Sequence, residues 1–238
     1  MQVYSKEEKI KYLDVDKNNQ LSNKAIINHM QDMAICHADS LGNGVNNASE
    51  THTAWLLLNW KIKVFNRPSC EEIIKINTWP RTMERCYSWR DFEVFHGGNK
   101  VAIATSKWVL VNTETGRIER VSEELKEKYK LKETSVFDEE ISEKLKEPEE
   151  MEIMYEDTVG RTRMDTNNHL NNVYYLDYAI EALPEEVYEN NTFNNIEIMY
   201  KKEIKYKDKI KCFYKCENSE HIVAIKSEDL KTLHQLFF

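Results

Sequence analysis

A short polar segment occurs twice in the 238-residue sequence, each time directly before a helical pattern. The first copy, residues 16–23, reads DKNNQLSN, and the second, residues 165–172, reads DTNNHLNN, so that five of the eight positions are identical. A chance match in an asparagine-rich chain is not expected at the same structural point of both halves. The repeat therefore predicts two similar domains, each built around one helix.

The first half reads as a helix followed by antiparallel strands. Ser22 or Asn23 can cap the helix, which ends before Gly42. Its apolar face consists of residues that recur at helical spacing: Ile26, Met30, Met33, His37 and Leu41. β-Branched and aromatic residues then dominate, as is typical of strands. The predicted strands are residues 53–65, 71–79, 86–95 and 100–112, with a hairpin at the glycine pair 97–98.

The same order recurs in the second half. Residues 122–152 are highly charged and broken by Pro148, which is typical of a linker that is helical in part. A short strand at 152–155 and the second polar segment then lead into a helix that ends at Pro184. Its apolar face consists of Val173, Leu176, Ile180 and Leu183. The predicted strands after it are residues 194–206, 209–216, 221–227 and 232–238.

A long helix wrapped by a strongly curved antiparallel sheet is the hot-dog arrangement. Two copies in one chain predict an α+β fold of the double hot-dog type. The expected organisation is an N-terminal domain over residues 1–133, a charged linker over 134–151 and a C-terminal domain over 152–238.

Composition excludes several classes of protein. A net charge of −8 disfavours nucleic-acid binding, which needs a basic footprint. The longest apolar run, residues 54–58, is too short to span a bilayer, and the N-terminus has no apolar signal region. The five cysteines are odd in number and spread singly, so that neither a disulfide framework nor a zinc site is indicated. We expect a cytoplasmic protein that is not associated with membranes.

The spacing of Asp165, Asn167 and His169 resembles the start of a calcium-binding loop. An EF-hand needs Gly at position six and Glu at position twelve, where this sequence has Leu170 and Leu176. The calcium interpretation is therefore excluded, and no metal is expected.

A polar turn that only caps a helix is the stronger alternative, because Asn and Asp commonly satisfy the free amides there. For the first copy we adopt this interpretation. In the second copy His169 replaces Gln20, and histidine is the side chain that titrates near neutral pH. The difference suggests that one half retains chemistry, although spacing alone leaves both interpretations open.

Residues 161–178, RTRMDTNNHLNNVYYLDY, resemble the signature loop of the acyl-acyl-carrier-protein thioesterases, in which Asp-x-Asn-x-His and Asn-Asn-Val precede an aromatic helix. Residues 199–203, MYKKE, are similar to a second family motif, and TWPR at 78–81 matches in the first half. The resemblance covers essentially the whole chain. It implies that the catalytic positions are Asp165, Asn167, His169 and Glu203, with no cofactor.

Two features qualify this assignment. Plant members of the family carry Cys directly after the glutamate, whereas this chain has Ile204, so that a Cys-His-Asn mechanism is not available here. Strand alternation alone would place Glu203 with Met199 and Lys201 as a surface charge. Only the resemblance favours a catalytic role for Glu203 over that alternative.

Hydrolysis of a thioester needs an activated water, donors to the oxyanion and a proton for the leaving thiol. We expect Asp165 or Glu203 to act as general base, Asn167 to position the water and His169 to relay its proton. Main-chain amides of residues 171–173 are candidates for polarising the carbonyl group.

The resemblance implies a fatty acyl chain on the phosphopantetheine of acyl carrier protein (ACP) as substrate. It places selection of acyl length in the N-terminal half, where the following side chains also suit ordinary core packing: Ile26, Met30, Met33, Trp55 and Trp60. ACP is acidic, so that a basic run is a candidate docking group, although such a run is often only a solvated face. This run is Lys201, Lys202, Lys205, Lys207 and Lys209, together with Arg161 and Arg163.

Other functions stay open on sequence grounds. A hydratase of the same fold has the pattern D-x-N-P-x-H, which Asn168-His169 does not meet. A non-catalytic module that binds acyl groups or ACP, or a thioesterase acting on coenzyme A esters, would share the fold. Either a monomer or a homodimer is compatible with two hot dogs in one chain.

Overall fold

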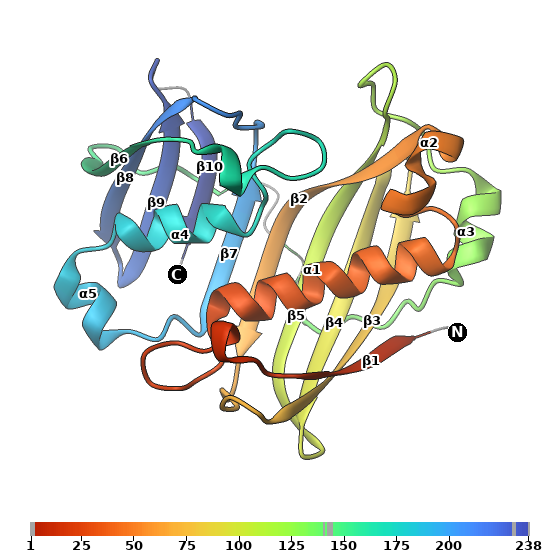
Figure 1. Cartoon of the computed structure of the whole chain (residues 1–238), viewed down its shortest axis with the longest axis horizontal. Helices are drawn as coiled ribbons and strands as arrows, with labels where there is room; N and C mark the ends of the chain where they lie inside the picture. The colour runs from red at the N-terminus through yellow and green to blue at the C-terminus, as the bar shows by residue number, and fades with distance from the viewer. Residues whose placement is uncertain (1–2, 140, 142–144, 230–231, 238) are drawn as a thin grey trace. The chain divides into compact units, whose positions relative to one another are not determined.

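The computed structural model describes residues 3–139, 141, 145–229 and 232–237. The chain divides into two compact units, Met1–Ile141 and Ser142–Phe238, each with its own helix and sheet (Figure 1). The division falls within the predicted linker, residues 134–151. Thr134 and Val136 in that linker still bond to the first unit, to Trp79 Nε1 and to the Asp91 carboxylate.

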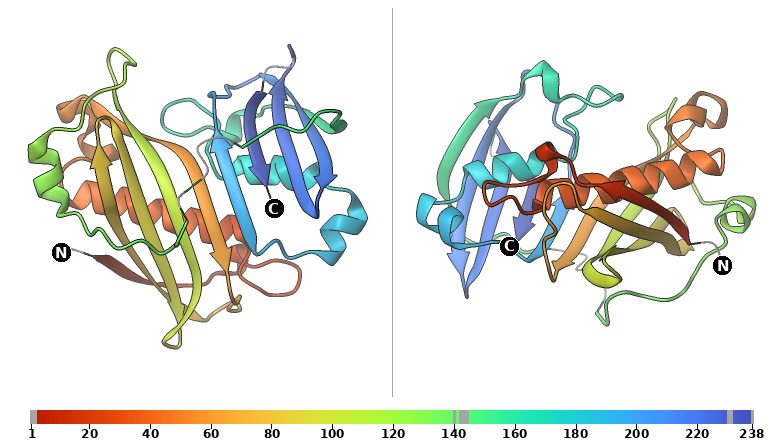
Figure 2. Two further views of the ribbon diagram at one scale, coloured as in Figure 1. Left: turned by 180° about the vertical axis from the view of Figure 1, so that it is seen from behind. Right: turned by 60° about the horizontal axis from the view of Figure 1, so that its bottom comes forward.

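The first unit is an antiparallel sheet with a long helix on one face. Its strands follow the order β1-β3-β4-β5-β2, and α1 lies across them in the views of Figures 1 and 2. The elements are β1 (Tyr4–Lys9), the 3-10 turn η1 (Tyr12–Asp14), α1 (Asn23–Ser40), η2 (Val45–Asn47), α2 (Ala48–Thr51), β2 (Thr53–Val64), β3 (Ile73–Glu84), β4 (Tyr87–His96), β5 (Asn99–Asn112) and α3 (Glu123–Tyr129).

The second unit repeats this topology. Its strands follow the order β6-β8-β9-β10-β7 and are likewise antiparallel. In both units the strand before the helix lies at one edge, and the first strand after the helix lies at the other. The elements are β6 (Glu152–Thr158), η3 (Arg161–Arg163), α4 (Tyr174–Glu181), α5 (Glu185–Asn190), β7 (Asn195–Tyr200), β8 (Lys209–Glu217), β9 (Glu220–Ser227) and β10 (Thr232–Phe237). The predicted double hot-dog fold is thus confirmed.

Strands β1 and β7 differ from the sequence prediction. Strand β1 was not predicted, because its sequence YSKEEK is charged and lies at a sheet edge, where one side is open to solvent. Strand β7 ends at Tyr200, short of the predicted 194–206. The predicted last strand includes Phe238, which lies outside the described residues.

Helix α1 forms as its capping and periodicity predict. The Ser22 hydroxyl accepts a hydrogen bond from the Ala25 amide at 3.2 Å, which satisfies one free donor of the first turn. Met30 is fully buried, and beneath the helix Trp60 and Phe92 pack with ring centroids 5.2 Å apart. Burying each such side chain stabilises the fold by roughly 1.5–3 kcal/mol. Within the part of the chain that the structure describes, no helix is both long and apolar enough to cross a bilayer.

The core of the first unit also contains a polar cluster. Nη1 of the buried Arg90 lies 3.0 Å from Nδ1 of His37 and 3.2 Å from the Thr78 hydroxyl. The guanidinium group faces the ring of Tyr129, 5.9 Å from its centroid. Burial, together with the charge of Arg90, lowers the pKa of His37 to about 3. The imidazole is therefore neutral at pH 7, and its Nδ1 atom accepts a hydrogen bond from Nη1 of Arg90.

Candidate active site

The polar loop before α4 is a tight hairpin closed by its own main chain. The amide of Asp165 donates to the carbonyl of His169 at 2.8 Å, and the amide of Asn171 donates to the carbonyl of Arg163 at 3.0 Å. Asn168 at the tip has a φ of 60°, a left-handed conformation that asparagine tolerates better than most residues. The loop thus presents His169 on its returning leg.

The carboxylate of Asp165 holds this loop together. Its Oδ1 atom accepts hydrogen bonds from the amide of Asn167 at 2.8 Å and from the amide of His169 at 3.1 Å. The side chain of Asn167 is exposed. Asp165 therefore has a structural role in addition to any part in catalysis.

A second segment runs beside the loop and brings Glu203 to it. The amide of Leu170 donates to the carbonyl of Ile204 at 2.8 Å, and His169 forms a β-bridge with Lys205. The buried phenol of Tyr175 on α4 hydrogen bonds to the main chain of Ile204. As a result, Nε2 of His169 lies 3.3 Å from Oε2 of Glu203.

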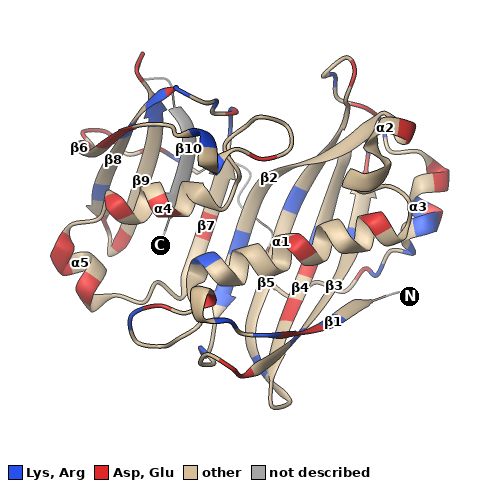
Figure 3. Ribbon diagram, in the orientation of Figure 1, with Lys and Arg blue, Asp and Glu red and all other residues tan. Residues whose placement is uncertain are grey.

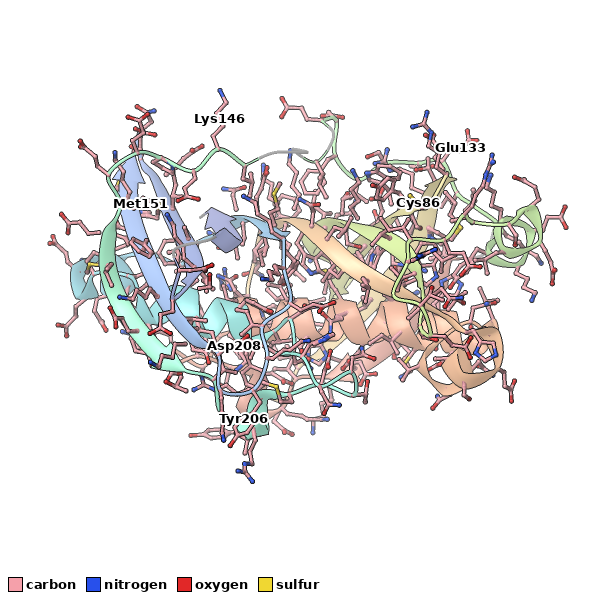
Figure 4. All side chains as sticks on the ribbon, turned by 90° about the horizontal axis from the view of Figure 1, so that it is seen from above. Cys86, Glu133, Lys146, Met151, Tyr206 and Asp208 are labelled. Carbon is pink, nitrogen blue, oxygen red and sulfur yellow. The ribbon has the colours of Figure 1, made fainter. Side chains whose placement is uncertain are left out.

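Because β7 ends at Tyr200, the strand-alternation argument does not apply to Glu203. The side chain of Glu203 is 53% exposed and that of His169 is 25% exposed, so that water reaches both. The following turn carries Tyr206 and Asp208, which are labelled in Figure 4, and the Asp208 carboxylate accepts the amide of Lys205 at 2.8 Å. The sequence suggested Glu203 only through the family resemblance, whereas the structure places it beside His169 independently of that resemblance.

The first polar segment has the same main-chain frame. Oδ1 of Asp16 accepts the amides of Asn18 at 2.8 Å and Gln20 at 3.0 Å, and the amide of Asp16 donates to the carbonyl of Gln20 at 2.8 Å. Asn19 has a φ of 60°, as Asn168 does. The hydrogen bonds of Asp165 therefore do not distinguish the two copies.

The two copies differ in the side chains that this frame presents. The amide of Leu21 donates to the carbonyl of Pro68 at 2.9 Å, as that of Leu170 donates to Ile204, so that Arg67 takes the place of Glu203. The guanidinium group of Arg67 donates to the carbonyl of Leu21 at 2.9 Å and to Oδ1 of Asn23 at 2.8 Å. An amide and a cation thus stand where the second copy has an imidazole and a carboxylate.

At these two positions the second copy has a pair of side chains suited to moving a proton, and the first copy does not. The expectation that the amides of residues 171–173 polarise a carbonyl group is wrong for two of them. The amide of Asn171 donates to Arg163, and the amide of Val173 donates to Oδ1 of Asn171 at 3.2 Å. Among the described residues, no group of three or more His, Cys, Asp or Glu side chains is placed to hold a metal ion.

Sequence comparisons agree with both halves of the structure. Residues 1–129 match the family described as "Acyl-ACP thioesterase N-terminal domain", and residues 142–236 match "Acyl-ACP thioesterase C-terminal domain". Oleoyl-acyl carrier protein thioesterase 2 of Arabidopsis thaliana is 25% identical over 90% of this chain and 63% of its own length. Dodecanoyl-[acyl-carrier-protein] hydrolase of Cinnamomum camphora is 26% identical over 82% of this chain and 54% of its own length. The chain thus spans less than two thirds of these curated relatives.

Solved structures show the same fold over almost the entire chain. An acyl-ACP thioesterase from Bacteroides thetaiotaomicron has a TM-score of 0.87 and 21% identity, over 99% of this chain and 96% of the other. The 12:0-ACP thioesterase from Umbellularia californica has a TM-score of 0.85 and 20% identity, over 99% of this chain and 95% of the other. With both halves matched by the two domain descriptions, the chain belongs to the acyl-ACP thioesterase family.

Proposed function

We propose that this protein hydrolyses fatty acyl thioesters of ACP and so releases free fatty acids during fatty acid synthesis. The observation that carries the proposal is the pairing of His169 with Glu203, at 3.3 Å, on a loop frame whose other copy has Gln20 and Arg67 instead. Membership of the thioesterase family and the activities for which its relatives are named support the same reaction.

In this mechanism His169, oriented by Glu203, removes a proton from a water molecule that attacks the thioester carbon. The C–O bond forms, the C–S bond breaks, and the departing sulfur takes a proton from the imidazolium. Glu203 is the better candidate for the assisting carboxylate, because Oδ1 of Asp165 already accepts two amides. The exposed amide of Asn167 is suited to positioning the water.

We assign binding of the acyl chain to the N-terminal unit and binding of ACP to the C-terminal unit. We place the acyl chain in the N-terminal unit, where the side chains of Ile26, Met30, Met33 and Trp60 are buried and Trp55 packs against a separate apolar cluster. The exposed lysines at 201, 202, 205, 207 and 209 make the segment beside the catalytic loop strongly basic. Figure 3 shows basic residues on η3 as well. Acidic ACP is the partner that such a surface would attract.

The test is a thiol-release assay on acyl-ACP substrates of graded chain length, run in parallel with the matching coenzyme A esters. Hydrolysis that is lost on His169→Ala supports the proposal. Binding of acyl-ACP without thiol release would identify a non-catalytic module, and faster hydrolysis of coenzyme A esters would identify the other class of thioesterase.

Each of the five cysteines, all among the described residues, is a free thiol, which supports a cytoplasmic location.

A further inference from the structure

Arg163 connects the base of the catalytic loop to two other elements of the C-terminal unit. Its main-chain carbonyl accepts the amide of Asn171, which closes the loop. Its Nη1 atom donates to Oδ2 of Asp157 on β6 at 3.1 Å. Its guanidinium group packs over the ring of Tyr178 on α4, 4.9 Å from the ring centroid. One side chain thus links the loop, the edge strand and the helix.

The N-terminal unit has a contact at the same two positions with different chemistry. The sequence offset that relates Asp16 to Asp165 also relates Asp14 to Arg163 and His29 to Tyr178. Oδ2 of Asp14 lies 3.3 Å from Nε2 of His29 on α1. Both units therefore join the first leg of the loop to the same point of the helix, through an acid and an imidazole in one and a guanidinium and a phenol in the other.

We propose that Arg163 is a positioning residue for thioester hydrolysis, which fixes the first leg of the catalytic loop to β6 and α4 through Asp157 and Tyr178. This inference rests on the hydrolase activity proposed above. The second leg is fixed separately, by the hydrogen bond from Leu170 to Ile204. The start of the first leg is also tied to the 205–208 turn, by the hydrogen bond from the Val159 amide to the carbonyl of Asp208 at 2.9 Å and by that from Nη2 of Arg161 to the Tyr206 hydroxyl at 2.9 Å. Arg163 adds the contacts of this leg to β6 and α4.

The expected effect lies in catalysis more than in stability. The side chains of Arg163 and Asp157 are 35% and 28% exposed, and partly exposed ion pairs contribute little to folding. Asp165 and His169 lie on the hairpin that this contact holds, and small displacements of catalytic groups reduce turnover strongly. Tyr178 is 1% exposed, so that the guanidinium group packs against a rigid part of the core.

The first experiment measures kcat and KM of Arg163→Met in the whole 238-residue chain with an acyl-ACP substrate. We expect kcat to fall about tenfold with KM changed by less than about twofold, because the loop is displaced while the five lysines of the basic run are kept and the charge of Arg163 is already paired with Asp157. Arg163→Lys, which still reaches Asp157, should recover part of the loss. The amide of Asn171 should exchange its hydrogen faster in Arg163→Met than in the unaltered chain.

The second experiment transplants the N-terminal pair. Arg163→Asp alone places a carboxylate beside Asp157 and should reduce kcat further. Adding Tyr178→His recreates the Asp14–His29 contact, and kcat should rise above that of Arg163→Asp alone. The N-terminal unit also has an acidic residue at the position of Asp157, because Glu8 on β1 corresponds to Asp157 on β6. The transplanted pair therefore keeps an acidic residue at the corresponding position of the edge strand.

Asp14→Met is the matched control, because it removes the corresponding contact from the loop that lacks His169 and Glu203. It should lower the melting temperature without lowering kcat. The inference is overturned if Arg163→Met keeps normal kcat, if Asp14→Met lowers kcat equally, or if the transplanted pair recovers nothing. Failure of the proposed function is a separate result: the unaltered chain would release no thiol from any acyl-ACP, while exchange at Asn171 would still report whether Arg163 holds the loop.

Discussion

Arg67 and Glu203 occupy the same place in two copies of one loop frame, and they carry opposite charges. Each directly precedes the residue, Pro68 or Ile204, whose carbonyl accepts the amide of the loop leucine. Glu203 pairs with His169, whereas Arg67 bonds to Leu21 and Asn23. The same frame thus accommodates either pair of side chains, an amide with a cation or an imidazole with a carboxylate.

We expect His169→Ala and Glu203→Gln each to reduce turnover by about 10²–10⁴-fold, the usual contribution of a general acid–base group. Folding should be unaffected, because both side chains are partly exposed. The measurement is kcat for an acyl-ACP with the melting temperature recorded alongside. Gln20→Ala, at the corresponding position of the first copy, should retain full turnover. Near-normal kcat in either site variant would remove that residue from the mechanism.

Parallel substitutions of Asp16 and Asp165 separate the structural role of the loop carboxylate from its proposed catalytic role. Replacing either by Ala removes an acceptor of two amides and should cost about 1 kcal/mol of folding free energy. Only Asp165→Ala should also lose turnover. Asp165→Asn keeps an oxygen acceptor, so that stability should be retained while kcat falls by orders of magnitude. Urea unfolding and kcat measured on the same preparations check this, and an active Asp165→Asn would restrict the residue to holding the loop.

The basic segment should affect ACP substrates selectively. Lys202→Glu combined with Lys207→Glu places two negative charges on the exposed stretch beside the loop and should raise KM for acyl-ACP about tenfold at low salt. Hydrolysis of a small thioester should be unchanged. Lys126→Glu combined with Lys128→Glu, on α3, is the charge-matched control. An unchanged KM for acyl-ACP would mean that these lysines are solvent-exposed charges with no part in binding ACP.

The buried His37 predicts a specific pH dependence of stability. Its pKa is about 3 in the folded protein and about 6.5 in the unfolded chain, so that unfolding takes up a proton below pH 6.5. This contribution is present in full above pH 6.5 and is lost as the pH falls towards 3, by about 1.4 kcal/mol per pH unit. His37→Gln lacks it, and its stability should decline less between pH 7 and pH 5 in urea titrations. Parallel declines in the two proteins would contradict the assignment.

Local sequence patterns predict much of the fold. Helix α1 and strands β2 to β5 follow from a capping serine, a helical apolar face and aromatic strands. Strand β1 could not be recognised locally, because its residues are polar and its position is fixed only by pairing with β3. The repeat itself carried the missing signal: the offset between the polar segments maps the predicted strand at 152–155 onto this part of the N-terminus.

The candidate site was harder to predict from sequence patterns than the fold was. The contrast between Gln20 and His169 pointed to the second loop, but the proximity of Glu203 depends on a tertiary contact between two segments. Extending the predicted strand to residue 206 gave Glu203 the wrong secondary structure, because β7 ends at Tyr200, although the predicted surface position of its side chain is correct. The contact of Arg163 with Tyr178 likewise depends on how the loop packs on α4, which spacing does not encode.

The hydrogen bonds of Arg67 make the divergence of the two halves hard to reverse. Arg67 bonds to Leu21 and Asn23, and the negative charge of Asp16 opposes the lowering of the Arg67 pKa by burial. A glutamate at this position would break both bonds and set two carboxylates near each other. Arg67 therefore supports the stability of the first loop, and the two loops are not interchangeable by a single substitution at this position.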